Sequence, residues 1–235
     1  MQNRYAGDIG DYIKLSLLRH ICPGKTLGVN WYLYPNENHN ADGRHTAYLS
    51  DPQHWRPLDP GLFDTLKGAV TGERSVKALE QCLGVSPVFF SVSLPTNGPA
   101  SERSAARSAW FQRSLQALSH CDLVFADPDN GLVSDDAHRR KDRTFGKRIP
   151  LSEVQALCAG RTAVIYHHNS RFKGGHDAEV DHWLQMIGLP SIAVRASAYS
   201  CRTFFIINPD NEIRTRTAEF CERWKSYKIR LHGTA

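Results

Sequence analysis

The chain has 235 residues and a formal charge of +5 at pH 7, and no break in composition divides it. A chain of this length can bury one sizeable core, so we predict a single domain over residues 1–235. The modest basic excess is compatible with a nucleic acid or another phosphate-bearing ligand as partner, without requiring one.

The six cysteines and the opening residues narrow the class of protein further. The cysteines stand singly, without a Cys-x-x-Cys pair, which argues against a zinc ribbon and a thioredoxin-like redox motif. No stretch approaches the roughly 18 apolar residues of a membrane helix, and the opening residues lack the apolar segment of a signal peptide. We therefore expect reduced thiols, a cytoplasmic location and no membrane partner.

In the first half of the chain, helical and strand patterns of apolar residues alternate, and Gly and Pro mark the breaks between them. We predict, in chain order, a helix over 8–21, a strand over 27–33, a polar loop over 34–45, helices over 61–70 and 73–83, and a strand over 88–94.

The second half continues the alternation. We predict a helix over 101–119, a strand over 122–126, a mobile polar loop over 127–149 with the basic cluster Arg139-Arg140-Lys141, a helix over 150–158, a strand over 162–166, a helix over 177–187, strands over 192–195 and 203–207, and a helix over 216–227. Apolar strands that alternate with helices indicate an α/β fold. The expected architecture is a Rossmann-like three-layer sandwich, with a mainly parallel sheet and an antiparallel strand near the C-terminus.

Three polar loops begin after Leu33, Ala126 and Tyr166, where such a fold binds its ligands. In an open parallel sheet the binding crevice lies beyond the carboxyl ends of the strands, so we expect the three loops to line one crevice. The turn Asp127-Pro128-Asp129-Asn130-Gly131 is the preferred centre because it sets two carboxylates at the mouth of a buried strand. Alternatively, these residues could form an Asx-turn whose only role is to end the strand. The turn does not have the spacing of a calcium loop, because Gly131 stands one place too early.

The loop after the third of these strands carries two adjacent histidines and a basic segment. Extended backbone would point His167 and His168 to opposite faces, so only one of them is expected to reach the crevice. His168 is the candidate acid or base, although a core histidine or a hydrogen-bonded surface histidine is the commoner outcome for such a pattern. Arg171, Lys173 and the Gly174-Gly175 pair before a helix could receive a phosphate or carboxylate.

The opening helix contains polar residues and a glycine that a routine amphipathic helix would not need. Gly10 costs roughly 1 kcal/mol relative to alanine inside a helix, which indicates close packing or a ligand near the helix start. Simple N-capping by Asp8 is the alternative interpretation.

Four landmarks in fixed order carry a resemblance to a known family. They are Tyr5-Ala6-Gly7-Asp8-Ile9-Gly10-Asp11-Tyr12-Ile13-Lys14, Asp127-Pro128-Asp129-Asn130, Ile165-Tyr166-His167 and Ile207-Asn208-Pro209-Asp210. The sequence resembles, distantly, the bacterial large-subunit ribosomal RNA adenine methyltransferases of the J type, which use S-adenosylmethionine on a Rossmann-like fold. It is also similar to a group of uncharacterised bacterial proteins that share the Asn-Arg-Tyr-x-Gly-Asp opening and the Asp-Pro-Asp-Asn-Gly turn.

The resemblance implies a methyltransferase-like protein that acts on or binds nucleic acid. Asp127 would orient the target amine, and Asn130 would contact the substrate from the same turn. The cofactor S-adenosylmethionine would lie near Lys14, Asp11 and the loop that contains Asn36, Glu37 and Asp42, while Arg171 and Lys173 would meet phosphates. The sequence departs from the pattern of this family in two places. No glycine-rich loop follows the first strand, and Asp129-Asn130 replaces the family's Pro-Tyr pair, whose aromatic ring stacks on a flipped base.

Two alternative functions remain open from the sequence. A metal-dependent nuclease or phosphohydrolase would hold Mg²⁺ or Mn²⁺ with Asp127 and Asp129, assisted by Asp11 or Glu37, and His168 would activate water. Alternatively, a non-catalytic interaction protein with a decayed cofactor site would use the basic loop over 139–143 as its contact surface. The missing glycine-rich loop favours this last hypothesis.

Overall fold

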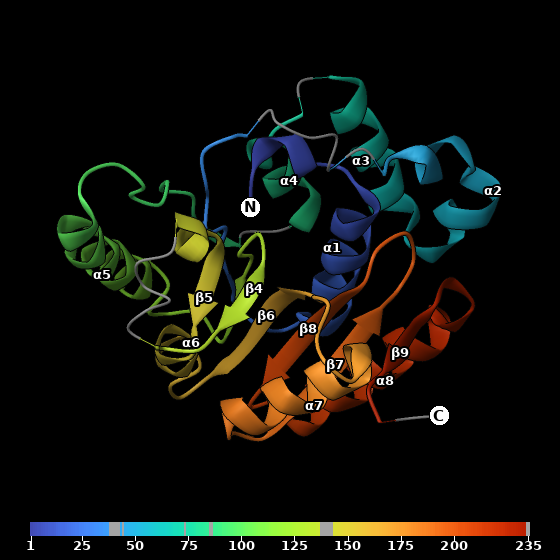
Figure 1. Cartoon of the computed structure of the whole chain (residues 1–235). Helices are drawn as coiled ribbons and strands as arrows, with labels where there is room; N and C mark the ends of the chain where they lie inside the picture. The colour runs from blue at the N-terminus through green and yellow to red at the C-terminus, as the bar shows by residue number, and fades with distance from the viewer. Residues whose placement is uncertain (38–42, 44, 73, 85–86, 137–142, 234–235) are drawn as a thin grey trace.

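The structure is a computed structural model that describes residues 1–37, 43, 45–72, 74–84, 87–136 and 143–233. Within these residues, seven strands form one sheet in the order β2-β1-β3-β6-β8-β7-β9, and two more strands form a separate pair (Figure 1). The strands of the main sheet are β1 (Leu27–Asn30), β2 (Val88–Phe90), β3 (Leu123–Ala126), β6 (Thr162–His168), β7 (Ser191–Ala196), β8 (Arg202–Ile207) and β9 (Ile229–Leu231).

Most of the sheet is parallel, and its reversed strands come late in the chain. Strands β2, β1, β3 and β6 run parallel to one another. Strand β8 lies between β6 and β7 and is antiparallel to both, and β9 is antiparallel to β7. The predicted Rossmann-like α/β sandwich, with a mainly parallel sheet and a reversed strand near the C-terminus, is confirmed.

Helices cover both faces of the sheet and divide the interior into two apolar cores. One core contains α1 (Ile9–Ile21), α3 (Pro60–Thr71), α4 (Val76–Glu80) and α8 (Asn211–Arg223); the other contains α5 (Ala100–Ala117), α6 (Leu151–Leu157) and α7 (Gly175–Ile187). The strands alternate between them: Phe125 packs into the first core, while its neighbours Val124 and Ala126 pack into the second. This period of two is what a sheet covered on both faces requires.

Helix α1 is buried on nearly every side, because it lies between the sheet and further helices of the first core. Its residues from Ile9 to Leu18 are all buried, including the charged side chains of Asp11 and Lys14. A helix buried all round normally carries apolar residues on every face. The two charges inside α1 therefore need a specific partner, which the site described below supplies.

Several element boundaries differ from the sequence predictions: the helix predicted over 73–83 spans Val76–Glu80, and the strand predicted over 88–94 ends at Phe90. Two other differences have a local reason. The strand predicted over 27–33 ends at Asn30, whose side-chain oxygen accepts a hydrogen bond from the Tyr32 amide at 3.2 Å, and Tyr32 then adopts a φ of 47°. The last helix begins at Asn211 rather than 216, because the Asp210 side chain accepts from the Ile213 amide and caps it. Side-chain caps of this kind fix where an element begins or ends more sharply than periodicity does.

The segment predicted as a polar loop over 127–149 contains structure that the sequence pattern missed. Strands β4 (Gly131–Val133) and β5 (Arg148–Pro150) form a parallel pair, and Leu132 and Ile149 are fully buried in it. Strands of three residues are too short to show a period of two. The Arg139-Arg140-Lys141 cluster lies outside the described residues.

Candidate functional site at the carboxyl edge of the sheet

A cavity of about 300 Å³ opens beyond the carboxyl ends of β3 and β6. Four segments bring polar side chains or glycines to it: the start of α1 (Asp8, Gly10, Asp11, Lys14), the turn after β3 (Asp127, Asp129, Asn130), the end of β6 (Tyr166, His168), and the residues at the start of β8 (Ser200, Arg202). Gly43 and His45 line it from the loop that follows the first strand. The three loops expected at this edge therefore do contribute to one cavity.

Lys14 connects the opening helix to the Asp127 turn. Its Nζ lies 2.5 Å from Oδ2 of Asp127 and 2.6 Å from Oδ1 of Asp11, and it also lies 5.7 Å from the centre of the Tyr166 ring. All three charged side chains are almost completely buried. Since a buried charge needs a paired and hydrogen-bonded partner, Lys14 and its two carboxylates form one electrostatic unit.

Burial and pairing act against each other on the pKa values of this unit. Burial raises the pKa of Asp11 to about 6, despite the nearby Lys14 ammonium, and it also raises the pKa of Asp127. Burial would lower the pKa of Lys14, but the carboxylates of Asp11 and Asp127 raise it overall. The unit therefore holds one firmly charged ammonium between two acidic side chains whose pKa values are both raised.

The second carboxylate of the turn, Asp129, binds the N-terminal segment. Its Oδ1 lies 2.6 Å from the Met1 ammonium, and its Oδ2 accepts from Nε2 of Gln2 at 2.5 Å. The Met1 ammonium also donates to the carbonyl oxygens of Tyr32 and Asp127. Figure 1 shows the N-terminus near the centre of the molecule, in line with these buried contacts. Both oxygens of Asp129 are thus engaged by residues 1 and 2.

The two adjacent histidines point to opposite faces, as predicted. His168 lines the cavity, with Nδ1 3.4 Å from the Tyr166 hydroxyl. His167 is buried: its Nδ1 accepts from the Leu132 amide at 3.0 Å, and its Nε2 lies 3.2 Å from Oε1 of Glu179. This hydrogen-bond pattern places the proton on Nε2. Burial lowers the pKa of His167, so His167 is a neutral, structural histidine.

Glu179 anchors the strand end that carries His168. Burial would raise its pKa, but hydrogen bonds from His167, Ser170 and Asn169 lower the pKa of Glu179 to about 2. A carboxyl group whose folded pKa is lowered contributes stability above its unfolded pKa, and this contribution is lost as the pH falls through the folded pKa.

The variant Glu179→Gln is therefore expected to unfold more easily at pH 7, by about 2–3 kcal/mol. The difference from the parent protein should shrink as the pH falls from 4.5, the ordinary pKa of a glutamic acid side chain, to about 2, since the parent loses the contribution there. Urea unfolding at a series of pH values measures this difference in the free energy of unfolding. Glu222→Gln, at a largely exposed position, is the matched control. A loss in Glu179→Gln that does not change with pH would contradict this role of the carboxylate.

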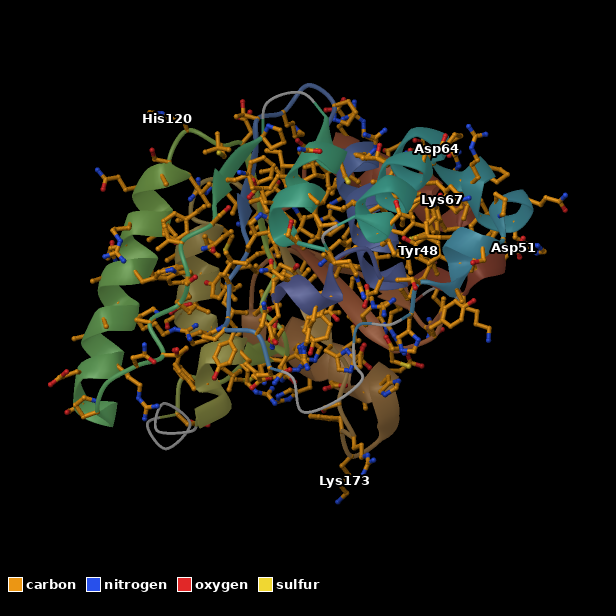
Figure 2. All side chains as sticks on the ribbon, turned by 90° about the horizontal axis from the view of Figure 1, so that it is seen from above. Tyr48, Asp51, Asp64, Lys67, His120 and Lys173 are labelled. Carbon is orange, nitrogen blue, oxygen red and sulfur yellow. The ribbon has the colours of Figure 1, made fainter. Side chains whose placement is uncertain are left out.

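The other predicted site residues lie outside the cavity or outside the described residues. The Asn36 side chain accepts from the Asn3 amide, and Glu37 bonds Gln2 and Lys147. Neither lines the cavity, and Asp42 is not among the described residues. Arg171 and Lys173 are exposed and do not line it, and Figure 2 shows Lys173 projecting from the surface.

Close packing explains the glycine inside α1. A Cβ at Gly10 would lie 2.9 Å from Oδ1 of Asp8 and 3.2 Å from Cζ of Arg202. The Asp8 side chain also caps the helix by accepting from the Asp11 amide. Close packing at Gly10 and N-capping by Asp8 therefore both account for the sequence pattern at the start of this helix. Arg202 was not a predicted site residue, since only the reversed direction of β8 brings its first residue to this edge of the sheet.

The carboxylates of the cavity do not assemble a metal site. Among the described residues, no group of three or more His, Cys, Asp and Glu side chains is placed to hold a metal ion. The two carboxylates proposed for Mg²⁺ or Mn²⁺ each have a cation already, Lys14 on Asp127 and the Met1 ammonium on Asp129. The geometry therefore gives no support to the hydrolase alternative.

The fold and the cavity together define a Rossmann-like α/β protein with a candidate small-molecule site at the carboxyl edge of its sheet. A comparison with protein-family models finds no match for the chain, and a comparison with curated proteins finds none either. In the part of the chain that the structure describes, each helix is too short or too polar to cross a membrane.

Proposed function

We propose that the protein is an S-adenosylmethionine-dependent methyltransferase-like enzyme that acts on nucleic acid. The observation that carries the proposal is the contact between Lys14 and Asp127, at 2.5 Å and 113 residues apart in sequence. These residues belong to separate landmarks of the resemblance, and Tyr166 of a third landmark lines the same cavity. The fourth landmark does not take part, because Asn208 follows the far end of the reversed strand β8.

The chemistry of the cavity suits the proposed cofactor. A volume of about 300 Å³ lies at the lower end of the range for small-molecule sites. The cavity carries the carboxylate of Asp8, which would complement a ligand with a sulfonium or ammonium charge, while Asp11 and Asp127 are paired with Lys14. S-Adenosylmethionine would supply the methyl group. Asn36, Glu37 and Asp42 are not needed for this proposal, because the described cavity is built without them.

Asp127 would hold the target amine. Its Oδ2 is taken by Lys14, whereas Oδ1 has no hydrogen bond to any described residue, so Oδ1 is available to accept an N–H of the substrate. Lys14 fixes the orientation of the carboxylate. Tyr166 lines the cavity with an aromatic ring, which would serve as the stacking face that Asn130 cannot provide. His168 stands beside it as a candidate to accept the proton that the amine releases.

Nucleic acid is the proposed substrate class because the chain carries a formal charge of +5. We also propose a cytoplasmic location, supported by six cysteines that are all unpaired in the structure. The non-catalytic alternative receives less support, because the three loops leave a polar cavity between them rather than packing it closed.

Isothermal titration calorimetry with S-adenosylmethionine and S-adenosylhomocysteine tests the proposal. We expect binding at roughly micromolar Kd, which corresponds to about −8 kcal/mol. A matched pair of variants, Asp11→Asn in the cavity and Asp64→Asn on the exposed surface of α3, should differ, with only the first weakening the binding. The absence of binding heat, together with an unchanged melting temperature in the presence of either compound, would overturn the proposed function.

A further inference from the structure

Arg202 is a buried arginine at the edge of the cavity, placed there by the reversal of β8. It is the first residue of that strand and pairs in register with His168, the last residue of β6. Because the two strands are antiparallel, the start of β8 lies at the same edge as the end of β6. Only 3% of Arg202 is exposed, and it lines the cavity with His168 and Tyr166.

The guanidinium group of Arg202 lacks the partners that a buried arginine normally has. Nη2 donates to the Ser200 hydroxyl. Nε and Nη1 are both buried and have no hydrogen-bond partner among the residues that the structure describes. Arginine is always protonated and carries five donors in a rigid fork, so an isolated guanidinium is costly to bury. By contrast, Arg107, the buried arginine of the second core, is fully paired with Glu153 and two backbone carbonyls.

The surroundings of Arg202 leave space and favour an anion. Gly10 lies against the guanidinium with no side chain of its own, in the first turn of α1. The amino end of a helix attracts negative charge through its exposed N–H groups and its dipole. The Lys14 ammonium adds positive charge but is already paired with Asp11 and Asp127. The Asp8 carboxylate, which caps the helix, lies on the same side of Gly10 as the guanidinium, since a Cβ at Gly10 would be 2.9 Å from Oδ1 of Asp8 and 3.2 Å from Cζ of Arg202.

We propose that Arg202 binds an oxyanion group of the cavity ligand, a carboxylate or a phosphate, through Nε and Nη1. Nε shares one edge of the guanidinium group with Nη2, and Nη1 shares the other edge with Nη2. Because Nη2 has a second N–H besides the one that it donates to Ser200, each of these edges can match two oxygens of such a group. Lysine cannot reproduce this geometry, because its ammonium is a single point charge. Asp8, beside the anion, would meet any positive charge that the ligand carries. This inference does not depend on methyl transfer.

The test compares Arg202→Lys and Arg202→Met with the same changes at Arg113, an exposed residue of α5 that does not line the cavity. Two probes are titrated by calorimetry: inorganic phosphate, and S-adenosylhomocysteine, which carries a carboxylate. We expect both Arg202 variants to lose about 10- to 100-fold in affinity for at least one probe, while the Arg113 variants bind as the parent does. Loss for S-adenosylhomocysteine alone identifies a carboxylate, and loss for phosphate alone identifies a phosphate.

The melting temperature without ligand separates this role from a structural one. A buried cation that lacks its anion destabilises the fold, so Arg202→Met should melt at the same temperature as the parent or higher. If Arg202 binds the ligand, Arg202→Met should be at least as stable as the parent protein and should bind the probe more weakly. Unchanged affinity of both Arg202 variants for both probes would overturn the proposal, as would a lower melting temperature of Arg202→Met with unchanged binding. Binding of phosphate through Arg202 without binding of S-adenosylhomocysteine would contradict the proposed function and leave the oxyanion site standing.

Discussion

Replacement of Asp127 by asparagine is expected to lower the rate of methyl transfer by about 100- to 1,000-fold, which is the effect of removing one preorganised polar group at a reacting centre. The substitution keeps the shape of the side chain but removes the negative charge that would hold the target amine. Lys14 retains Asp11 as a partner at 2.6 Å, so the helix keeps a compensating charge and the protein should still fold.

Transfer of a labelled methyl group from S-adenosylmethionine to a mixture of bacterial RNAs measures this effect, with Asp64→Asn as the control. Asp64 is exposed and paired with Arg56, and its replacement should leave the rate unchanged. Calorimetry on the same variants separates chemistry from binding, because the affinity of Asp127→Asn for the cofactor should fall much less than its rate. A variant that transfers methyl groups as fast as the parent would remove Asp127 from the reaction.

Replacement of Lys14 by methionine is expected to lower the free energy of unfolding by about 3–5 kcal/mol at pH 8, because it leaves two buried carboxylates without a counter-charge. The loss should shrink as the pH falls from 8 towards about 6, because without the Lys14 ammonium the pKa of Asp11 lies above the value of about 6 that it has in the parent, so the variant takes up the proton first. The sign follows from the raised pKa: a buried acid whose folded pKa is raised gains stability as it takes up its proton. Urea unfolding at pH 8 and pH 5 measures the difference.

Two further variants identify the cause of that loss. Lys67→Met, at an exposed position on α3 that is labelled in Figure 2, should change the stability by no more than about 0.5 kcal/mol. The triple variant Lys14→Met, Asp11→Asn, Asp127→Asn removes the whole charged unit and should recover most of the stability. If the triple variant were as unstable as Lys14→Met alone, lost packing rather than unpaired charge would be the cause.

The sequence located the Asp127 turn because its signals are local. A buried apolar strand followed at once by Asp, Pro, Asn and Gly requires only neighbouring residues to be recognised. The same holds for the alternation of helices and strands, which predicted the sheet, and for the opposed directions of His167 and His168, which follow from the period of a strand. Local patterns could not reveal β4 and β5, since each has three residues.

The partners of that turn were decided by the tertiary structure. Asp127 meets Lys14 across 113 residues of sequence, and Asp129, which the sequence suggested as a catalytic group or metal ligand, instead holds Met1 and Gln2. The sequence by itself therefore determined the fold class, the edge of the sheet at which the polar loops meet and the residues of the turn. The cavity, the pairing of each carboxylate and the position of Arg202 depend on contacts between distant segments, for which a linear pattern carries no signal.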